Sequence, residues 1–214
     1  MLQIVFTKRK AAVKGPAIFI DRDGVINRRR PDDYVLNSSQ FVFVPGIRAA
    51  LKQLASLQLP MIVISNQAAV GKGLLEPATL RNITFRMQQT LSAHGTLLAA
   101  AYYCTHRQDE GCICRKPKPE LLYRAADDFN VDLSRSIFIG DSETDVQAAR
   151  AAGCKPVLFG SVPGSRTDSL GCMTDLPVAL TASDLFDVAV KCLQIPSWAV
   201  TCKQLVSESS LDLF

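Results

Sequence analysis

The sequence has no apolar run long enough to cross a lipid bilayer and no secretory signal at its start. A membrane-spanning helix needs about 18 or more consecutive apolar residues, and no segment of the 214-residue chain reaches this length. The opening residues, MLQIVFTKRK, place their positive charges after a short apolar run, which is the reverse of the order in a signal peptide. We therefore expect a cytoplasmic protein with no membrane partner.

A large excess of one charge sign is also lacking. The 24 Lys and Arg residues nearly balance the 20 Asp and Glu residues, which gives a formal net charge of +4. This balance does not favour a nucleic acid as partner, but it suits a small anionic ligand. With 48% hydrophobic residues, the chain can form a core without disulfide bonds. The seven cysteines are then expected to be buried thiols, metal ligands or nucleophiles.

Four short apolar segments have the character of buried parallel strands. They are AIFI (17–20), MIVI (61–64), SIFI (136–139) and PVLF (156–159), and each leads into polar or glycine-containing residues. Helical patterns separate them over residues 46–58, 77–93, 119–129 and 143–152. This alternation predicts an α/β protein with a doubly wound parallel sheet, in which ligands bind at the carboxyl ends of the strands.

The same patterns divide the chain into three parts. Residues 1–16 are expected to form an N-terminal extension, residues 17–194 the main domain, and residues 195–214 a C-terminal tail of unassigned role. Near the end of the main domain, residues 178–193 predict a strand and a last helix with Ser183 as its N-cap. The segments after Asn27 and after Gly73 hold only loops and one helix, so that no large cap domain is expected.

Two aspartates directly follow the first predicted strand, in the sequence DRDGVIN. The carboxylates of Asp21 and Asp23 repel each other unless a cation or a shared proton lies between them. A plain Asp-Gly turn at a strand end has the same appearance in the sequence. The pair by itself therefore leaves open whether the role is chemical or structural.

Polar residues near the later strand ends add to this pair. Ser65 and Asn66 follow MIVI, Lys116 precedes a proline-started helix, and Asp141 and Asp145 follow SIFI. Together they predict one cleft with an acidic side that binds a metal. Its other side, a hydroxyl, backbone N–H groups and an ammonium, would bind a phosphate.

The order and spacing of these groups resemble the four motifs of the haloacid dehalogenase-like phosphohydrolases, over about residues 16–160. The segments DRDGVIN, SNQ and CRKPKP are similar to the subgroup that contains the D-glycero-D-manno-heptose 1,7-bisphosphate 7-phosphatases and the histidinol-phosphate phosphatases. The resemblance implies a Rossmann-like fold and a Mg²⁺-dependent phosphomonoesterase, for which we expect a minimal cap and a monomer. The favoured substrate is heptose 1,7-bisphosphate. Histidinol phosphate, or a non-catalytic phosphosugar-binding role, are the alternatives.

The resemblance also assigns roles to individual residues. Asp21 is the nucleophile that forms an aspartyl phosphate, and Asp23 protonates the leaving oxygen and then activates water. Mg²⁺ is held by Asp21, the backbone carbonyl of Asp23 and Asp141. Asp145 orients Lys116 or a metal-bound water, and a solvated helix residue is the plainer alternative. Four residues bind the substrate and its phosphate: Ser65, Asn66, Arg115 and Lys116.

The segment CTHRQDEGCICRKP (104–117) concentrates three cysteines and a histidine. In the subgroup, a cysteine-rich loop at this place binds zinc. Four residues supply a complete tetrahedral set for a structural Zn²⁺: Cys104, His106, Cys112 and Cys114. Such a loop would fix the direction of Arg115 and Lys116. Unliganded thiols are the plainer alternative. A zinc module for nucleic acid would leave the acidic residues unexplained, because they repel a phosphate backbone.

The chain departs from the subgroup in two places that concern substrate recognition. NQAAVGKG stands where relatives often have NQSGIARG, and Lys72 cannot make the planar bidentate contact of an arginine. Arg28 to Arg30 form a run of three arginines after the nucleophile motif. They could bind a second phosphate or form a solvated loop.

Overall fold

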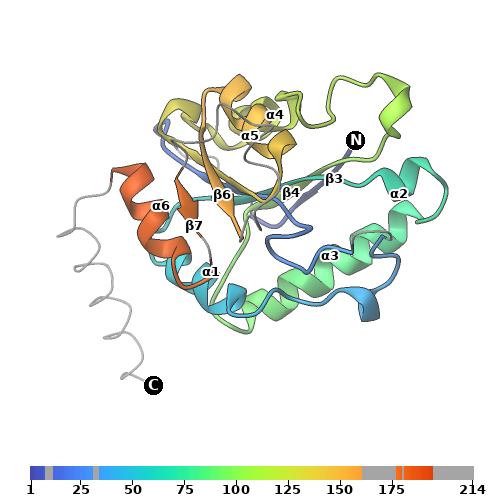
Figure 1. Cartoon of the computed structure of the whole chain (residues 1–214), viewed down its shortest axis with the longest axis horizontal. Helices are drawn as coiled ribbons and strands as arrows, with labels where there is room; N and C mark the ends of the chain where they lie inside the picture. Colours follow the sequence, from blue (N-terminus) through green and yellow to red (C-terminus); the bar gives the residue numbers. More distant parts are fainter. Residues whose placement is uncertain (8–11, 31–33, 161–176, 180, 195–214) are drawn as a thin grey trace.

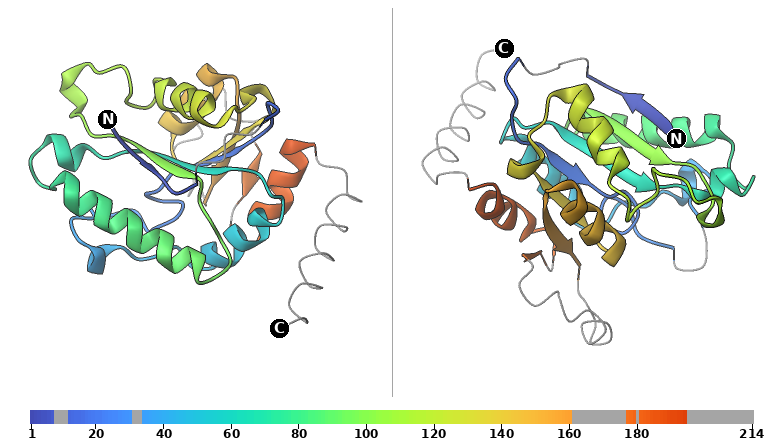
Figure 2. Two further views of the ribbon diagram at one scale, coloured as in Figure 1. Left: turned by 180° about the vertical axis from the view of Figure 1, so that it is seen from behind. Right: turned by 90° about the horizontal axis from the view of Figure 1, so that it is seen from above.

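A computed structural model of the protein describes residues 1–7, 12–30, 34–160, 177–179 and 181–194. Within these residues, seven strands form one mixed sheet in the order β1-β4-β3-β2-β5-β6-β7 (Figures 1 and 2). The strands are β1 (Leu2–Val5), β2 (Ile18–Ile20), β3 (Met61–Asn66), β4 (Ala100–Cys104), β5 (Ile137–Gly140), β6 (Lys155–Phe159) and β7 (Val178–Ala179). The C-terminal tail, residues 195–214, lies outside the described residues.

The four predicted strands are confirmed as β2, β3, β5 and β6. At the centre of the sheet, β2 pairs in parallel with both β3 and β5, with Ile18 opposite Met61 on one side and Ile137 on the other. Their carboxyl ends therefore meet at one edge of the sheet, as the doubly wound topology requires.

The sheet is not wholly parallel, because β1 runs antiparallel to β4 at the edge, with Leu2 opposite Tyr103. Leu2–Val5 belong to the segment that the sequence analysis assigns to an N-terminal extension, and they are an integral part of the sheet. Strand β4, AAYYC, was missed because its alanines give little of the β-branched character that marks a strand.

Six helices of the described chain cover both faces of the sheet. They are α1 (Ile47–Ala55), α2 (Ala68–Gly71), α3 (Pro77–Ser92), α4 (Glu120–Phe129), α5 (Glu143–Ala152) and α6 (Leu185–Leu193), with short 3₁₀ turns η1 (Ser38–Gln40), η2 (Gln108–Glu110) and η3 (Leu133–Arg135). Figure 1 shows α4 and α5 on one face and α1 and α3 on the other. None of the described helices has the length and apolar character of a membrane span.

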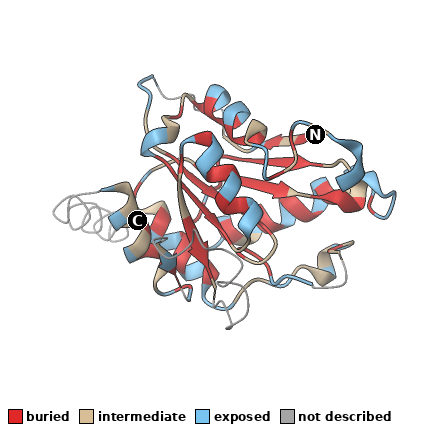
Figure 3. Ribbon diagram, turned by 45° about the horizontal axis from the view of Figure 1, so that its top comes forward, coloured by how far each residue is buried: buried red, intermediate tan, exposed pale blue. Residues whose placement is uncertain are grey.

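The inner strands β2, β3, β4 and β5 are buried on both faces, which explains their nearly continuous apolar sequences (Figure 3). Ile18 and Ile20 point into the core under α1, α3 and α6. Phe19, between them, points into the second core under α4 and α5. The alternation of side chains along a strand thus lets three residues of β2 anchor both helical layers.

The predicted last helix is present as α6, but the prediction of Ser183 as its N-cap is wrong. The N-cap is Asp184, whose carboxylate accepts bonds from the N–H and hydroxyl of Thr181, at 2.8 and 2.9 Å. Ser and Asp are similarly favourable N-cap residues, so two adjacent candidates cannot be separated without the geometry of the preceding turn.

Replacing Ile4 by Ala tests whether β1 contributes to the core. Ile4 is buried on β1, whereas its neighbour Val5 is exposed on the same strand. We expect Ile4→Ala to lower the free energy of unfolding by about 2 to 5 kcal/mol because it opens a cavity. Val5→Ala, the matched control, should cost less than about 1 kcal/mol. Urea unfolding measures both, and equally small effects would show that β1 adds little to the fold.

Candidate active site

The sequence-predicted polar residues lie together at the carboxyl ends of the central strands. Asp21 follows β2, Ser65 and Asn66 end β3, and Asp141 follows β5. The side chain of Lys116 enters the same place from the loop before α4 and contacts Asp21. The parallel pairing of β2 with β3 and β5 brings together residues that are up to 120 positions apart in the chain.

Lys116 is the central contact of this group. Its buried ammonium lies 2.8 Å from Oδ1 of Asp21 and 2.6 Å from Oδ1 of Asp145, and it donates to the carbonyl of Ile64 at 3.1 Å. Burial by itself would lower the pKa of Lys116, but the two carboxylates more than offset it and hold the pKa above its usual value. The side chain is therefore a fixed positive charge between two strand ends.

Asp145 contacts Lys116, which is one of the two orienting roles that the resemblance implies. It is buried in the first turn of α5, and its Oδ2 accepts the N–H of Ser142 at 3.1 Å. The burial argues against a solvated helix residue. Ser142 caps this helix, so its hydroxyl also serves the turn that places Asp145.

Three carboxylates form a group with metal-ligand spacing. Asp21, Asp141 and Asp145 each offer an oxygen within 4.8 Å of the others. Burial raises the pKa of Asp21 to about 6, despite the opposing charge of Lys116. Burial likewise raises the pKa of Asp141 to about 7, with the charge of Asp21 adding to it. A divalent cation would relieve this repulsion, and carboxylate oxygens are the ligands that Mg²⁺ prefers.

A glycine makes room for one of these carboxylates. Gly24 has φ +99°, and a Cβ there would overlap the carboxyl group of Asp141. The DG pair in DRDGVIN is therefore more than a turn signal, because the absent side chain is what lets Asp141 approach β2.

Asp23 has a different environment from Asp21. Arg22 donates to both of its oxygens, with Nη2 at 2.9 Å from each, and Nδ2 of Asn27 and Nε2 of Gln67 add bonds of 2.9 and 2.6 Å. Burial raises the pKa of Asp23, but these donors outweigh burial and hold the pKa below its usual value. Asp21 therefore has a raised pKa and Asp23 a lowered one. The predicted first step needs the opposite, an ionised Asp21 and a protonated Asp23.

The predicted phosphate-binding side is partly gathered around one cavity. A cavity of about 380 Å³ is lined by Asn66, Arg115 and Lys116 together with the cysteine loop. The amide of Asn66 makes two 3.1 Å bonds with the backbone of Lys116, donating to its carbonyl and accepting its N–H. Ser65 is buried beside this cavity, and its Oγ accepts from Gln67 at 3.1 Å.

One residue of the arginine run reaches the acidic group. Nη2 of Arg29 lies 3.0 Å from Oδ1 of Asp141, and its side chain is about half exposed (52%). The backbone N–H of Arg28 donates to Val42, which anchors the loop beside the site. Lys72, the other departure from the subgroup, lies over the ring of Tyr34 at 5.3 Å.

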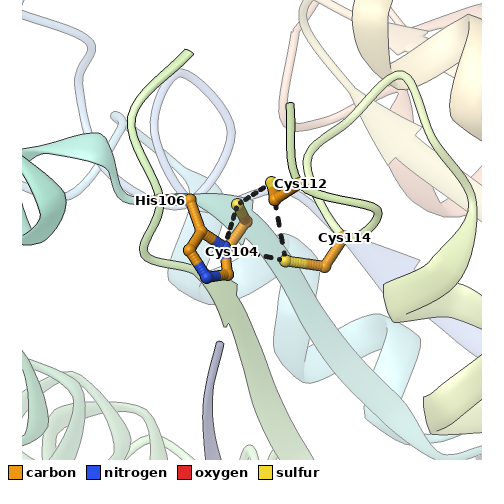
Figure 4. A group of neighbouring side chains, drawn as sticks. All are labelled: Cys104, His106, Cys112 and Cys114. Carbon is orange, nitrogen blue, oxygen red and sulfur yellow. Dashed lines mark hydrogen bonds between the residues drawn. The ribbon is translucent and has the colours of Figure 1, made fainter. Parts of the chain in front are cut away.

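The four residues of the cysteine loop converge at the end of β4 (Figure 4). Sγ of Cys104 lies 3.6 Å from Sγ of Cys112 and 3.7 Å from Nδ1 of His106, while Sγ of Cys114 lies 3.3 Å from the same nitrogen and 3.9 Å from Cys112. Ligands around one zinc ion lie roughly 3.5 to 3.8 Å apart, given bonds of about 2.3 Å to sulfur and 2.0 Å to nitrogen. The cluster is therefore compatible with tetrahedral zinc, and its three cysteines form no disulfide bond.

The sequence analysis missed three residues that contact Asp23 directly. Arg22 and Asn27 lie inside DRDGVIN, and Gln67 ends the segment SNQ. All three were visible as polar residues at strand ends. Their inward direction was not, because all three lie beyond the ends of β2 and β3, where the regular alternation of side chains no longer applies.

Residues 7–153 match the model of the haloacid dehalogenase-like hydrolase family. The chain belongs to this family. This confirms the predicted α/β fold, the predicted family and the predicted enzyme class, a phosphoric monoester hydrolase.

Several of the similar proteins are heptose-bisphosphate phosphatases. The D-glycero-beta-D-manno-heptose-1,7-bisphosphate 7-phosphatase of Bordetella bronchiseptica is 35% identical over 178 residues, which cover 83% of this chain and 97% of that protein. The D-glycero-alpha-D-manno-heptose-1,7-bisphosphate 7-phosphatase of Mycobacterium bovis is 38% identical over 151 residues, 67% of this chain and 78% of that protein. A crystal structure of D,D-heptose 1,7-bisphosphate phosphatase from B. bronchiseptica, complexed with magnesium and phosphate, has a TM-score of 0.75 at 30% identity. The aligned part covers 82% of this chain and 98% of the chain in that crystal structure.

Gly140→Ala tests how tightly Asp145 is held. A Cβ at Gly140 would overlap the Cβ of Asp145 and lie 2.6 Å from its Oδ2. We expect this substitution to displace Asp145 from Lys116, to lower the free energy of unfolding by about 1 to 3 kcal/mol and to reduce phosphatase activity. Gly15→Ala is the control, since its Cβ would meet nothing closer than 3.9 Å. Wild-type stability and activity in Gly140→Ala would show that Asp145 can move freely.

Proposed function

We propose that this protein is a Mg²⁺-dependent phosphomonoesterase that removes the 7-phosphate of D-glycero-D-manno-heptose 1,7-bisphosphate. The observation that carries the proposal is the buried contact of Lys116 with Asp21 and Asp145, close to Asp141. The names of the curated relatives support the substrate. We further propose that the chain, with β1 as part of its catalytic domain, acts as a monomeric cytoplasmic enzyme on this small phosphosugar.

Asp21 is the proposed nucleophile. One of its oxygens attacks the phosphorus, and the bond from phosphorus to the sugar oxygen breaks, which leaves an acyl phosphate, the aspartyl phosphate, on Asp21. The ammonium of Lys116 keeps the attacking carboxylate ionised and in place. Mg²⁺ bound by Asp21, the carbonyl of Asp23 and Asp141 would act as a Lewis acid on the phosphate oxygens.

Asp23 is the proposed general acid and base. It gives a proton to the departing sugar oxygen, and then takes a proton from the water that attacks the phosphorus and releases Asp21. The donors around Asp23 favour its carboxylate form, which suits the second step. The first step requires that the negative charge of the bound substrate raises the pKa of Asp23, as a nearby anion does for any carboxyl group.

Ser65, the N–H of Asn66, Arg115 and Lys116 are the proposed ligands of the substrate phosphate. Asn66, Arg115 and Lys116 line one cavity, and the ammonium of Lys116 lies 2.8 Å from Asp21, the proposed attacking group. Hydrogen-bond donors fixed in this way stabilise the charge that develops on the phosphate oxygens during transfer.

A zinc ion on Cys104, His106, Cys112 and Cys114 is the second proposed cofactor. All four positions of the tetrahedron are taken by protein atoms, so that the role is structural. Arg115 and Lys116 directly follow the last ligand. The ion would therefore fix the chain from which both substrate-binding cations extend.

The direct test compares phosphate release, with Mg²⁺ present, from both anomers of D-glycero-D-manno-heptose 1,7-bisphosphate and from histidinol phosphate. We expect kcat/KM to be highest for one anomer of the bisphosphate, and Asp21→Asn to abolish turnover of all three. A preference for histidinol phosphate would overturn the substrate. No turnover of any phosphoester by the metal-loaded protein would indicate a binding protein.

The affinity for Mg²⁺ should rise with pH. Protons compete with the cation for Asp21 and Asp141, because burial raises the pKa of these groups to about 6 and about 7. Both must be ionised to bind metal, so we expect binding at pH 5.5 to be weaker than at pH 8 on the order of tenfold or more. Calorimetric titration with MgCl₂ measures this. Asp187→Asn, on the exposed side of α6, is the control and should keep the pH dependence.

Loss of one cysteine ligand should affect metal content, stability and activity together. We expect Cys112→Ser to lower the zinc content measured by atomic emission, to lower Tm and to reduce kcat/KM, because the loop no longer fixes Arg115 and Lys116. Cys192→Ser, a thiol on α6 outside the loop, is the matched control. Unchanged zinc and activity in Cys112→Ser would contradict the structural role of the ion.

A further inference from the structure

We infer that Gln67 is a positioning residue, whose side-chain amide holds Asp23 in the orientation for proton transfer. The inference rests on the proposed role of Asp23 as general acid. Nε2 of Gln67 lies 2.6 Å from Oδ2 of Asp23 and 3.1 Å from Oγ of Ser65. Since a primary amide nitrogen carries two hydrogens, it can donate to both oxygens at once. The amide thus connects Ser65, near the end of β3, to Asp23, in the turn after β2.

The backbone of Gln67 is itself held by the cysteine loop. Its N–H donates to the carbonyl of Cys104 at 2.7 Å, and Cys104 is both the last residue of β4 and one of the four clustered ligands. Gln67 is the N-cap of α2. At the other end of this short helix, a Cβ on Gly71 would lie 2.6 Å from the carbonyl oxygen of Thr105. Helix α2 therefore lies directly against the loop at both of its ends.

This contact connects the cysteine loop to the active site in a second way. One path leads forward along the chain from Cys114 to Lys116. The other leads through the carbonyl of Cys104 to Gln67 and so to Asp23. A displaced loop would move the general acid as well as the phosphate-binding cations.

The site requires an amide with the length of glutamine. A glutamate would place a second carboxylate against Asp23, and the two charges would repel. An asparagine is one methylene shorter. Gln67 is also buried (3% exposed), so water cannot readily replace its hydrogen bonds. Fixed orientation matters because proton transfer needs the acid within hydrogen-bond reach of the leaving oxygen.

The test is Gln67→Met, which keeps the length and volume of the side chain but removes both donors. Two substrates are compared: heptose 1,7-bisphosphate, whose leaving sugar oxygen needs a proton, and p-nitrophenyl phosphate, whose leaving phenolate is stable without one. Because kcat/KM reports the steps up to release of the leaving group, we expect it to fall about 10- to 100-fold for the sugar phosphate and only a few-fold for the aryl phosphate. Gln67→Asn should give a smaller loss of the same kind.

Gln88→Met is the matched control. Gln88 is also buried, on α3 away from the site, where it donates to Ser92 and accepts the N–H of Leu98. We expect this variant to lower Tm with both kcat/KM values unchanged. If Gln67→Met lowers kcat/KM equally for the two substrates, or leaves both at the wild-type value, the positioning role is overturned.

Asp23→Asn separates this outcome from a failure of the proposed mechanism. If Asp23→Asn loses the sugar-phosphate activity while Gln67→Met keeps it, the positioning role is wrong and the proposed function stands. If Asp23→Asn itself keeps wild-type activity, the general-acid role of Asp23 is wrong, and the inference on Gln67 falls with it.

Discussion

The buried ammonium of Lys116 is the interaction on which the rest of the site depends. It lies between Asp21 and Asp145 at the carboxyl ends of β2 and β5 and also donates to Ile64 of β3. Without this charge, the buried carboxylates of Asp21, Asp141 and Asp145 would have no cation of the chain at their centre, and ionising them would be costly. One side chain thus both stabilises three strand ends and keeps an acidic group ready for a metal.

The position of Lys116 is in turn set by elements distant from it in the sequence. The amide of Asn66 makes two bonds with its backbone, and the cysteine cluster ends two residues before it. The same cluster reaches Gln67 through the carbonyl of Cys104. The loop therefore lines the same cavity as Asn66, Arg115 and Lys116.

Asp21 and Asp23 show how two carboxyl groups two residues apart acquire different chemistry. Burial dominates at Asp21 and raises its pKa to about 6. At Asp23 the donors Arg22, Asn27 and Gln67 outweigh burial, and the pKa is lowered. Four of these five residues come from a single heptapeptide, DRDGVIN, and the fifth, Gln67, directly follows the neighbouring strand β3. The difference between the two acids is thus a property of the folded strand ends.

The sequence by itself determined the alternation of strands and helices, the four central strands and the residues that meet at their carboxyl ends, because apolar runs and strand-end polar groups are local patterns. It also determined the composition and spacing of the cysteine cluster. Strand β1, the inward direction of Arg22 and Gln67 and the N-cap at Asp184 were decided only by the tertiary structure. The same is true of the choice of Lys116 as the group that Asp145 contacts. Each of these depends on which group lies opposite across the fold, and a side chain's partner and pKa are set by that neighbour rather than by its own place in the chain.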